Sequence, residues 1–164
     1  MISIFGIVSI VIALISVVAI VLHNRVMNKR TPVDTYLEEL EVLLRDRVEM
    51  LHGSAAPGSR LRSLCDQCTY LDFESILEAL PDVNEALDDA KEAGDLIISG
   101  SFKDDFEAAA AENITFTAID ENAQKIQETI TALNQSIENY NSFIASRLGV
   151  LMAQILGLEA EDPV

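Results

Sequence analysis

The sequence predicts an all-α protein in which a single N-terminal transmembrane helix precedes an antiparallel helical bundle with a long C-terminal helix. Three observations predict this fold class. Residues 2–22 form an uncharged, apolar run. Apolar residues then recur at spacings of three and four through most of the chain, which is the period of an amphipathic helix. No segment alternates apolar and polar residues over a useful length, so a β-sheet has no support.

The organisation follows from where charge and hydrophobicity lie. The chain has 164 residues, of which 27 are acidic and 11 are basic, for a net charge of -16. Its mean hydropathy is nevertheless positive, at +0.24. We expect an anchor over residues 1–22, a basic juxtamembrane segment over residues 23–30, a helical-bundle domain over residues 31–158 and an acidic disordered tail over residues 159–164. So acidic a chain offers no extended phosphate-binding surface, and we expect no nucleic-acid partner.

The apolar run has the length of a membrane span. As a helix rising 1.5 Å per residue, residues 2–22 extend roughly 30 Å, the thickness of the hydrocarbon core of a bilayer. A cleaved signal peptide would begin with basic residues, carry a shorter apolar run and end at a small-residue cleavage site. Nothing basic precedes this run, and Val21-Leu22-His23-Asn24 is no such site. We therefore expect an uncleaved anchor in the lipid bilayer.

The residues after the anchor predict its orientation. Arg25, Lys29 and Arg30 follow the span, and no acidic residue occurs before Asp34. The positive-inside rule then predicts a single-pass protein of the cell membrane with its N-terminus outside and its C-terminal domain in the cytoplasm. The alternative is that these cations only contact lipid headgroups, which happens in either orientation.

The first bundle helix is predicted to begin at Thr31-Pro32 and to end at His52-Gly53. Thr is a good N-cap and Pro suits the first helical position. The predicted apolar face of this helix consists of Val33, Leu37, Leu40, Leu44 and Leu51.

The middle of the chain predicts shorter helices. The first covers residues 59–80, and Asp72 either interrupts it or re-caps it. The second begins at Pro81 and ends at Ser99-Gly100, and a third begins at Ser101. The β-branched stretch of residues 113–117 weakens the helix prediction at that place.

The last segment predicts one long helix from Asp120 to Leu156. Its apolar face repeats at spacings of four and three, and consists of Ile126, Ile130, Leu133, Ile137, Tyr140 and Ile144. The repeat shifts near Arg147-Leu148-Gly149, as at a stutter. We expect these apolar faces to form the bundle core. Any apolar residues that the bundle does not bury are expected to form a surface for a partner or for self-association.

Two blocks of sequence carry a family resemblance. The first contains Val33-Asp34, then an apolar-acidic-Val-x-Leu run leading into basic residues; the second contains a Tyr-Asn pair and a closing Leu-Gly. The matching residues are Val33, Asp34, Val42, Leu44, Arg45, Arg47, Tyr140, Asn141 and Gly157. In these residues, and in the order anchor, basic flank, helix and long final helix, the chain resembles a divergent member of the LemA family.

The resemblance implies one N-terminal transmembrane helix and a helical-bundle body, and it implies no catalytic residues. The chain departs from the family pattern in that Asp46 separates Arg45 from Arg47, and residues 65–118 do not align. Pro32 is also unexpected inside a helix that the family often continues from the membrane.

The sequence contains few motifs that indicate a catalytic or metal-binding site. Cys65-x-x-Cys68 has the spacing of a redox or metal motif, but it lacks a βαβ setting, a second pair or a nearby His. Both thiols fit an apolar helix face, and we interpret them as reduced core residues. The acidic pairs Asp88-Asp89 and Asp104-Asp105 lack the spacing of an EF-hand and are interpreted as solvated. We expect no catalytic residues, no metal and no cofactor.

These predictions favour a non-enzymatic scaffold or adaptor that contacts a protein partner or a second copy of itself at the cytoplasmic face of the membrane. The runner-up is a self-assembling membrane or filament subunit that packs through its apolar N-terminal helix. A metal or redox protein using Cys65 and Cys68 is the third hypothesis.

Overall fold

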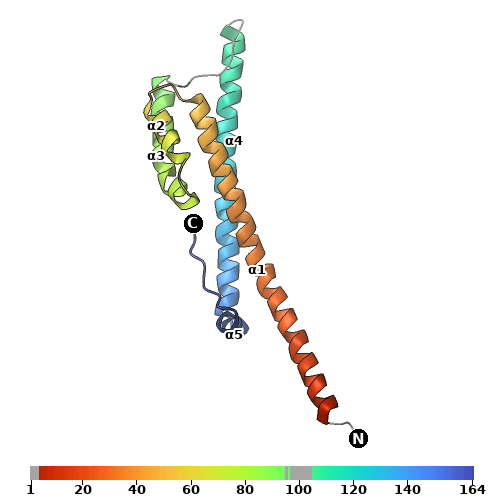
Figure 1. The fold of residues 1–164 in the computed structure, drawn as a ribbon. Coiled ribbons are helices and arrows are strands. Elements are labelled where there is room, and N and C mark those ends of the chain that lie inside the picture. Colours follow the sequence, from red (N-terminus) through yellow and green to blue (C-terminus); the bar gives the residue numbers. More distant parts are fainter. Residues whose placement is uncertain (1–3, 95, 97–104) are drawn as a thin grey trace. The chain divides into compact units, whose positions relative to one another are not determined.

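The computed structural model describes residues 4–94, 96 and 105–164, and over these residues the protein is helical without a β-strand (Figure 1). The helices are α1 (Ile4–Ser54), α2 (Arg60–Cys68), α3 (Phe73–Ala93), α4 (Asp105–Ala145) and α5 (Arg147–Leu156). The predicted all-α class is confirmed. The chain divides into a first unit, residues 1–37 with 130–164, and a second unit, residues 38–129.

The helix α1 continues through Pro32, so the predicted helix start at Thr31-Pro32 is wrong. Pro32 has no amide N–H, and one helical hydrogen bond is lost there. The Thr35 hydroxyl donates to the carbonyl of Thr31 at 2.8 Å. Val26 and Val33, seven residues apart on one face, are both buried in the first unit. This shared burial on both sides of Pro32 favours one uninterrupted helix over a break.

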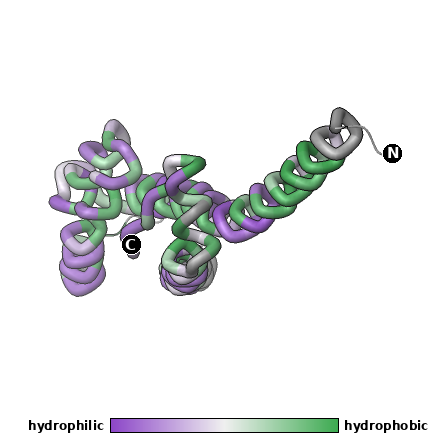
Figure 2. Tube along the Cα trace, turned by 90° about the horizontal axis from the view of Figure 1, so that it is seen from below, coloured by the Kyte–Doolittle hydropathy of each residue, from purple (hydrophilic) through white to green (hydrophobic). Residues whose placement is uncertain are grey.

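The N-terminal part of α1 is mostly apolar, as the predominantly green tube shows (Figure 2). Only 6% of its most apolar 18-residue window is buried in the protein. A core helix of a soluble protein would be mostly covered, and this one is not. By length and composition, α1 is able to cross a membrane.

The core of the first unit joins α1 to α4 and α5. Val26 and Val33 of α1, Leu133, Ile137 and Tyr140 of α4, and Met152 of α5 are buried there.

The expected single helix from Asp120 to Leu156 is also wrong, because α4 begins at Asp105, ends at Ala145 and is followed by the separate helix α5. Ser146 has an extended backbone and caps α5, its hydroxyl oxygen accepting from the Gly149 amide at 3.1 Å. A Cβ atom on Gly149 would collide with the Phe143 carbonyl oxygen. The shift in the apolar repeat near Arg147-Leu148-Gly149 therefore marks a tight break between two helices.

The second unit packs the remainder of α1, all of α2 and α3, and the first part of α4. Its buried apolar residues come from all four helices and include Leu40, Leu44, Leu51, Leu61, Cys65, Ile76, Val83, Leu87, Ile119 and Ile126.

The predicted helix over residues 59–80 is two helices. The helix α2 ends at Cys68, and Asp72 begins α3 by accepting the Ser75 amide on its carboxylate at 2.9 Å. Of the two roles predicted for Asp72, re-capping is the correct one. The helix α3 then continues through Pro81, which is not a helix start, and ends at Ala93, with Gly94 as its C-cap at a φ of 69°. The predicted boundaries at Ser99-Gly100 and Ser101 lie outside the described residues.

The tail also differs from its prediction. Residues 159–164 are not helical, but they are not free either, since the backbones of Glu161 and Val164 are hydrogen-bonded to α4. Two asparagines of α4 make these bonds, whereas the sequence predicts a disordered segment.

Candidate functional site

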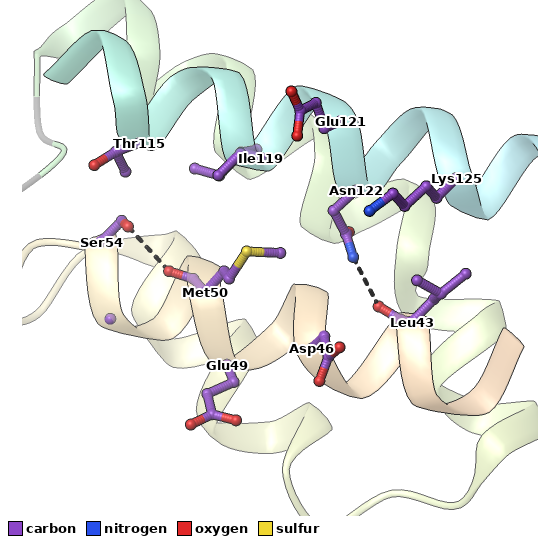
Figure 3. A pocket seen from close by; sticks show the side chains of 12 residues that line it. Leu43, Asp46, Glu49, Met50, Ser54, Thr115, Ile119, Glu121, Asn122 and Lys125 are labelled. Carbon is purple, nitrogen blue, oxygen red and sulfur yellow. Dashed lines mark hydrogen bonds between the residues drawn. The ribbon is translucent and has the colours of Figure 1, made fainter. Parts of the chain in front are cut away.

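An open cleft of about 720 Å³ lies in the second unit, between α1 and α4 (Figure 3). It is lined by Leu43, Asp46, Glu49, Met50, Gly53, Ser54, Thr115, Ala118, Ile119, Glu121, Asn122 and Lys125. The size is that of a site for a small ligand or for a few side chains of a partner.

The cleft has an apolar floor and an acidic rim. Ile119 of α4 and Met50 of α1 lie between the two helices (Figure 3). Asp46 and Glu49 come from α1, and Glu121 comes from α4. These three carboxylates outnumber the one cation among the lining residues described, Lys125, so the rim is negative. A ligand with an apolar body and positive charge matches such a surface.

Asn122 contributes an unsatisfied acceptor to the cleft. Its Nδ2 donates to the carbonyl of Leu43 at 3.2 Å, so the amide joins α4 to α1. Its Oδ1 is buried and has no protein partner. A buried acceptor is costly when unpaired.

Arg47 stabilises the core of this second unit and is only 5% exposed. Its guanidinium donates to Asn84 Oδ1 of α3 at 2.6 Å and to the Ile119 carbonyl of α4 at 3.3 Å. Burial lowers the pKa of Arg47, while Asp120 and Asp88 act in the opposite direction. An arginine remains charged even so, and its role is to join α1, α3 and α4.

A second hollow, of about 480 Å³, lies beside α2. On its wall His52 Nε2 is 2.8 Å from Asp66 Oδ1, and Arg62 donates to the His52 carbonyl at 2.8 Å. These contacts join the end of α1 to α2.

Cys65 and Cys68 are both buried as free thiols in the second unit, which confirms that they pack in the core. Burial raises the pKa of Cys65 to about 11, with a further rise from Cys68 and Asp66. Burial also raises the pKa of Cys68. The thiolate is the reactive and metal-binding form, and burial disfavours that form at both sulfurs.

Among the residues that the structure describes, no group of three or more His, Cys, Asp or Glu side chains is placed to hold a metal ion. The expectation of a chain without metal, cofactor or catalytic residue stays a prediction.

The predicted membrane-flank cations lie on α1 in the first unit. Arg25 and Lys29 are exposed, whereas Arg30 is half-buried. Arg30 lies 3.7 Å from a carboxylate oxygen of Asp34 and 3.7 Å from one of Glu161. Two of the three cations therefore remain available for lipid headgroups, and the third pairs within the protein.

The structure separates the residues that resemble the LemA family. Val33, Leu44, Arg47 and Tyr140 are buried in the two cores, while Asp34, Val42 and Arg45 are exposed. Asn141 binds the tail, and Gly157 ends α5 with a φ of 64°. These residues are divided between the two units.

The residues predicted for a bundle or partner face lie on the inner sides of α1 and α4. Leu40, Ile126, Leu133 and Ile137 are buried, and Leu37, Ile130 and Ile144 are half-buried.

Two polar positions were missed, although the sequence contains a signal for each. Arg47 lies in the apolar face of α1, because Leu40, Leu44, Arg47 and Leu51 follow at spacings of 4, 3 and 4. Asn122 lies in the corresponding face of α4, three residues after Ile119 and four before Ile126. A polar residue in phase with an apolar face predicts a buried hydrogen bond.

Comparison with protein-family models, with curated proteins and with solved structures gave no match. The resemblance to the LemA family therefore stays a prediction.

Proposed function

We propose that this protein is a membrane-anchored, non-enzymatic adaptor whose helical body holds a partner protein at the cytoplasmic face. The single observation that carries the proposal is the continuity of α1. Its exposed apolar part is able to cross a membrane, and the same helix then lines the acidic-rimmed cleft.

Anchoring is supported by the exposure of the apolar residues. Ile12, Leu14, Ile15 and Ile20 are each about 60% exposed. So much exposed apolar surface is costly in water and favourable in lipid.

Orientation is supported by Arg25 and Lys29, which are exposed directly after the apolar part. Cations at that position favour a cytoplasmic body. A membrane-impermeant amine reagent, applied to intact and to permeabilised cells, tests this with Lys125 as the reporter. We expect labelling only after permeabilisation; equal labelling of intact cells would place the body outside.

The partner role is supported by the cleft. Its apolar floor and negative rim match a basic, amphipathic segment of another protein. The mixture of apolar and acidic side chains in its lining is suited to binding.

The test is site-specific photo-crosslinking in intact cells. A photoreactive side chain replaces Ala118, in the cleft, and in a matched control it replaces Glu128, exposed on the same helix. We expect a reproducible link to a second protein from position 118 alone. Links only between copies of this chain, or equal links from both positions, would contradict the adaptor proposal.

A second candidate function is self-assembly, which the exposed apolar residues of α5 favour. Leu148, Val150, Ile155 and Leu156 are exposed on a short helix of the first unit. Static light scattering of the detergent-purified chain tests it. Self-assembly predicts an oligomer that Ile155→Glu dissociates, and a monomer at all concentrations would exclude it.

A further inference from the structure

The tail of the chain is bound to α4 by side-chain amides. Asn141 donates through Nδ2 to the Glu161 carbonyl at 2.8 Å and accepts the Glu161 amide on Oδ1 at 3.0 Å. Asn134 makes the same pair with Val164, at 2.9 Å in each direction. All four bonds lie within the first unit.

The spacing of these contacts is that of an extended strand on a helix. Asn134 and Asn141 are seven residues apart, which is about 10.5 Å along a helix. Glu161 and Val164 are three residues apart, which is about 10 Å along an extended chain. The lower-numbered asparagine binds the higher-numbered tail residue, so the tail runs antiparallel to α4.

These amides recognise backbone rather than side chains. Each asparagine pairs with one N–H and one C=O, groups that nearly every residue presents. Any extended segment without proline at the two bound positions is therefore able to make the same four bonds.

Arg30 adds a preference for acidic sequence. Its guanidinium lies 3.7 Å from the Glu161 carboxylate, on α1 of the same unit. Tyr140, next to Asn141 on α4, is fully buried with a hydroxyl that has no protein partner. The surroundings of the tail thus contain a cation for an acidic side chain and a polar group that the tail leaves unsatisfied.

We propose that Asn134, Asn141 and Arg30 form a binding site for an extended acidic segment of a partner protein, and that the chain's own tail occupies this site as a competing ligand. This site belongs to the first unit and takes an acidic segment, whereas the cleft belongs to the second unit and matches a basic one. The inference therefore goes beyond the adaptor proposal, and it rests on that proposal only in assigning the segment to a partner.

The test uses the full chain in detergent micelles and a fluorescent peptide with the sequence of residues 158–164. The variant Glu161→Pro/Val164→Pro removes the two tail N–H donors and leaves the asparagines intact. We expect the peptide to bind this tail-released chain at least tenfold tighter than the wild type. Adding Asn141→Ala should abolish most of that gain, whereas Asn139→Ala, an exposed asparagine on the same helix, should leave it unchanged.

A charge exchange tests the role of Arg30. A peptide with Lys in place of Glu161 should bind the tail-released chain at least fivefold more weakly, and Arg30→Glu in the chain should restore its binding. Absence of peptide binding to a folded tail-released chain, or equal weakening by Asn139→Ala and Asn141→Ala, would overturn the proposal. The proposal would also be overturned if the wild type forms dimers and the tail substitutions abolish them. The tail of a second copy of the chain, and not a partner protein, would then fill the site.

Hydrogen exchange on the wild-type chain keeps the test independent of these variants. We expect slow exchange at the amides of Glu161 and Val164, and faster exchange when excess peptide displaces the tail. Unprotected amides would overturn the proposal. Because only the purified chain and a peptide are used, failure here is distinguishable from failure to find a partner in cells.

Discussion

Arg45 and Arg47 lie two residues apart on α1 and have opposite environments. Arg45 is exposed and pairs with Glu41, one turn earlier, at 2.9 Å. Arg47 is buried and donates to groups of α3 and α4. Two residues turn a helix by about 200°, which places one arginine in solvent and the other in the core.

Replacing Arg47 should therefore lower the free energy of unfolding more than replacing Arg45 does. Arg47→Met keeps an apolar stem but leaves the half-buried Asn84 oxygen without its donor and removes the buried bond to the Ile119 carbonyl. We expect a loss of about 1–3 kcal/mol in the free energy of unfolding. Arg45→Met removes a pair within one helix and should cost less than about 0.5 kcal/mol. Denaturant titration followed by circular dichroism measures both, and equal losses would contradict the buried role of Arg47.

Cys65 makes stability dependent on alkaline pH. Its pKa in the folded protein is raised to about 11 from an ordinary value of 9.0, chiefly by burial. A raised folded pKa means that the protonated thiol stabilises the fold. This contribution is complete below pH 9 and is lost as the pH rises from 9 to 11.

The measurement is the free energy of unfolding of the wild type and of Cys65→Ala between pH 8 and 11. Other groups titrate in this range as well, so the informative quantity is the difference between the two proteins. We expect the wild type to lose more stability than Cys65→Ala over this interval. Parallel curves would show that the Cys65 thiol is not buried.

At the scale of elements, the break between α4 and α5 depends on Gly149. The Ser146 hydroxyl oxygen accepts the Gly149 amide, and the backbone of residues 143 and 144 lies against the position that a Cβ would occupy. Backbone cannot move aside as a flexible side chain can.

Gly149→Ala should destabilise the first unit by about 1–3 kcal/mol through overpacking. Gly53→Ala is the matched control, because Gly53 lies inside α1 with no atom within 4 Å of its missing Cβ. Removing a glycine from a helix should raise stability there by about 0.5–1 kcal/mol. Thermal unfolding of both variants measures the difference, and a neutral Gly149→Ala would contradict the tight turn.

At the scale of the whole molecule, anchoring rests on the first part of α1. Ile12→Arg/Ile15→Arg places two charges in the apolar run, each costing about 2.5–3.5 kcal/mol at the centre of a membrane helix. We expect this variant to leave the membrane fraction on carbonate extraction.

Val42→Arg serves as the control for the span variant. Val42 is an exposed apolar residue of the same helix beyond the predicted span, so Val42→Arg should stay in the membrane fraction. If the Ile12/Ile15 variant also stays, the apolar run is not the anchor.

The sequence alone determined the helical class, the apolar run and the phase of the apolar faces, and it marked Asp72 as a point where a helix is interrupted or re-capped. These features depend on neighbours within a few residues, and their period is visible locally. The same local rules misplaced the helix boundaries at Pro32 and Pro81, because packing on both sides of a proline outweighs the one hydrogen bond that it removes.

The tertiary structure decided the contacts between distant residues. Arg47 reaches Ile119, 72 positions away, and Asn134 binds Val164, 30 positions away. Whether a polar side chain is desolvated and paired depends on which residues fold against it, and helical periodicity does not specify that. The buried arginine and the bound tail therefore emerge only when the helices are packed together.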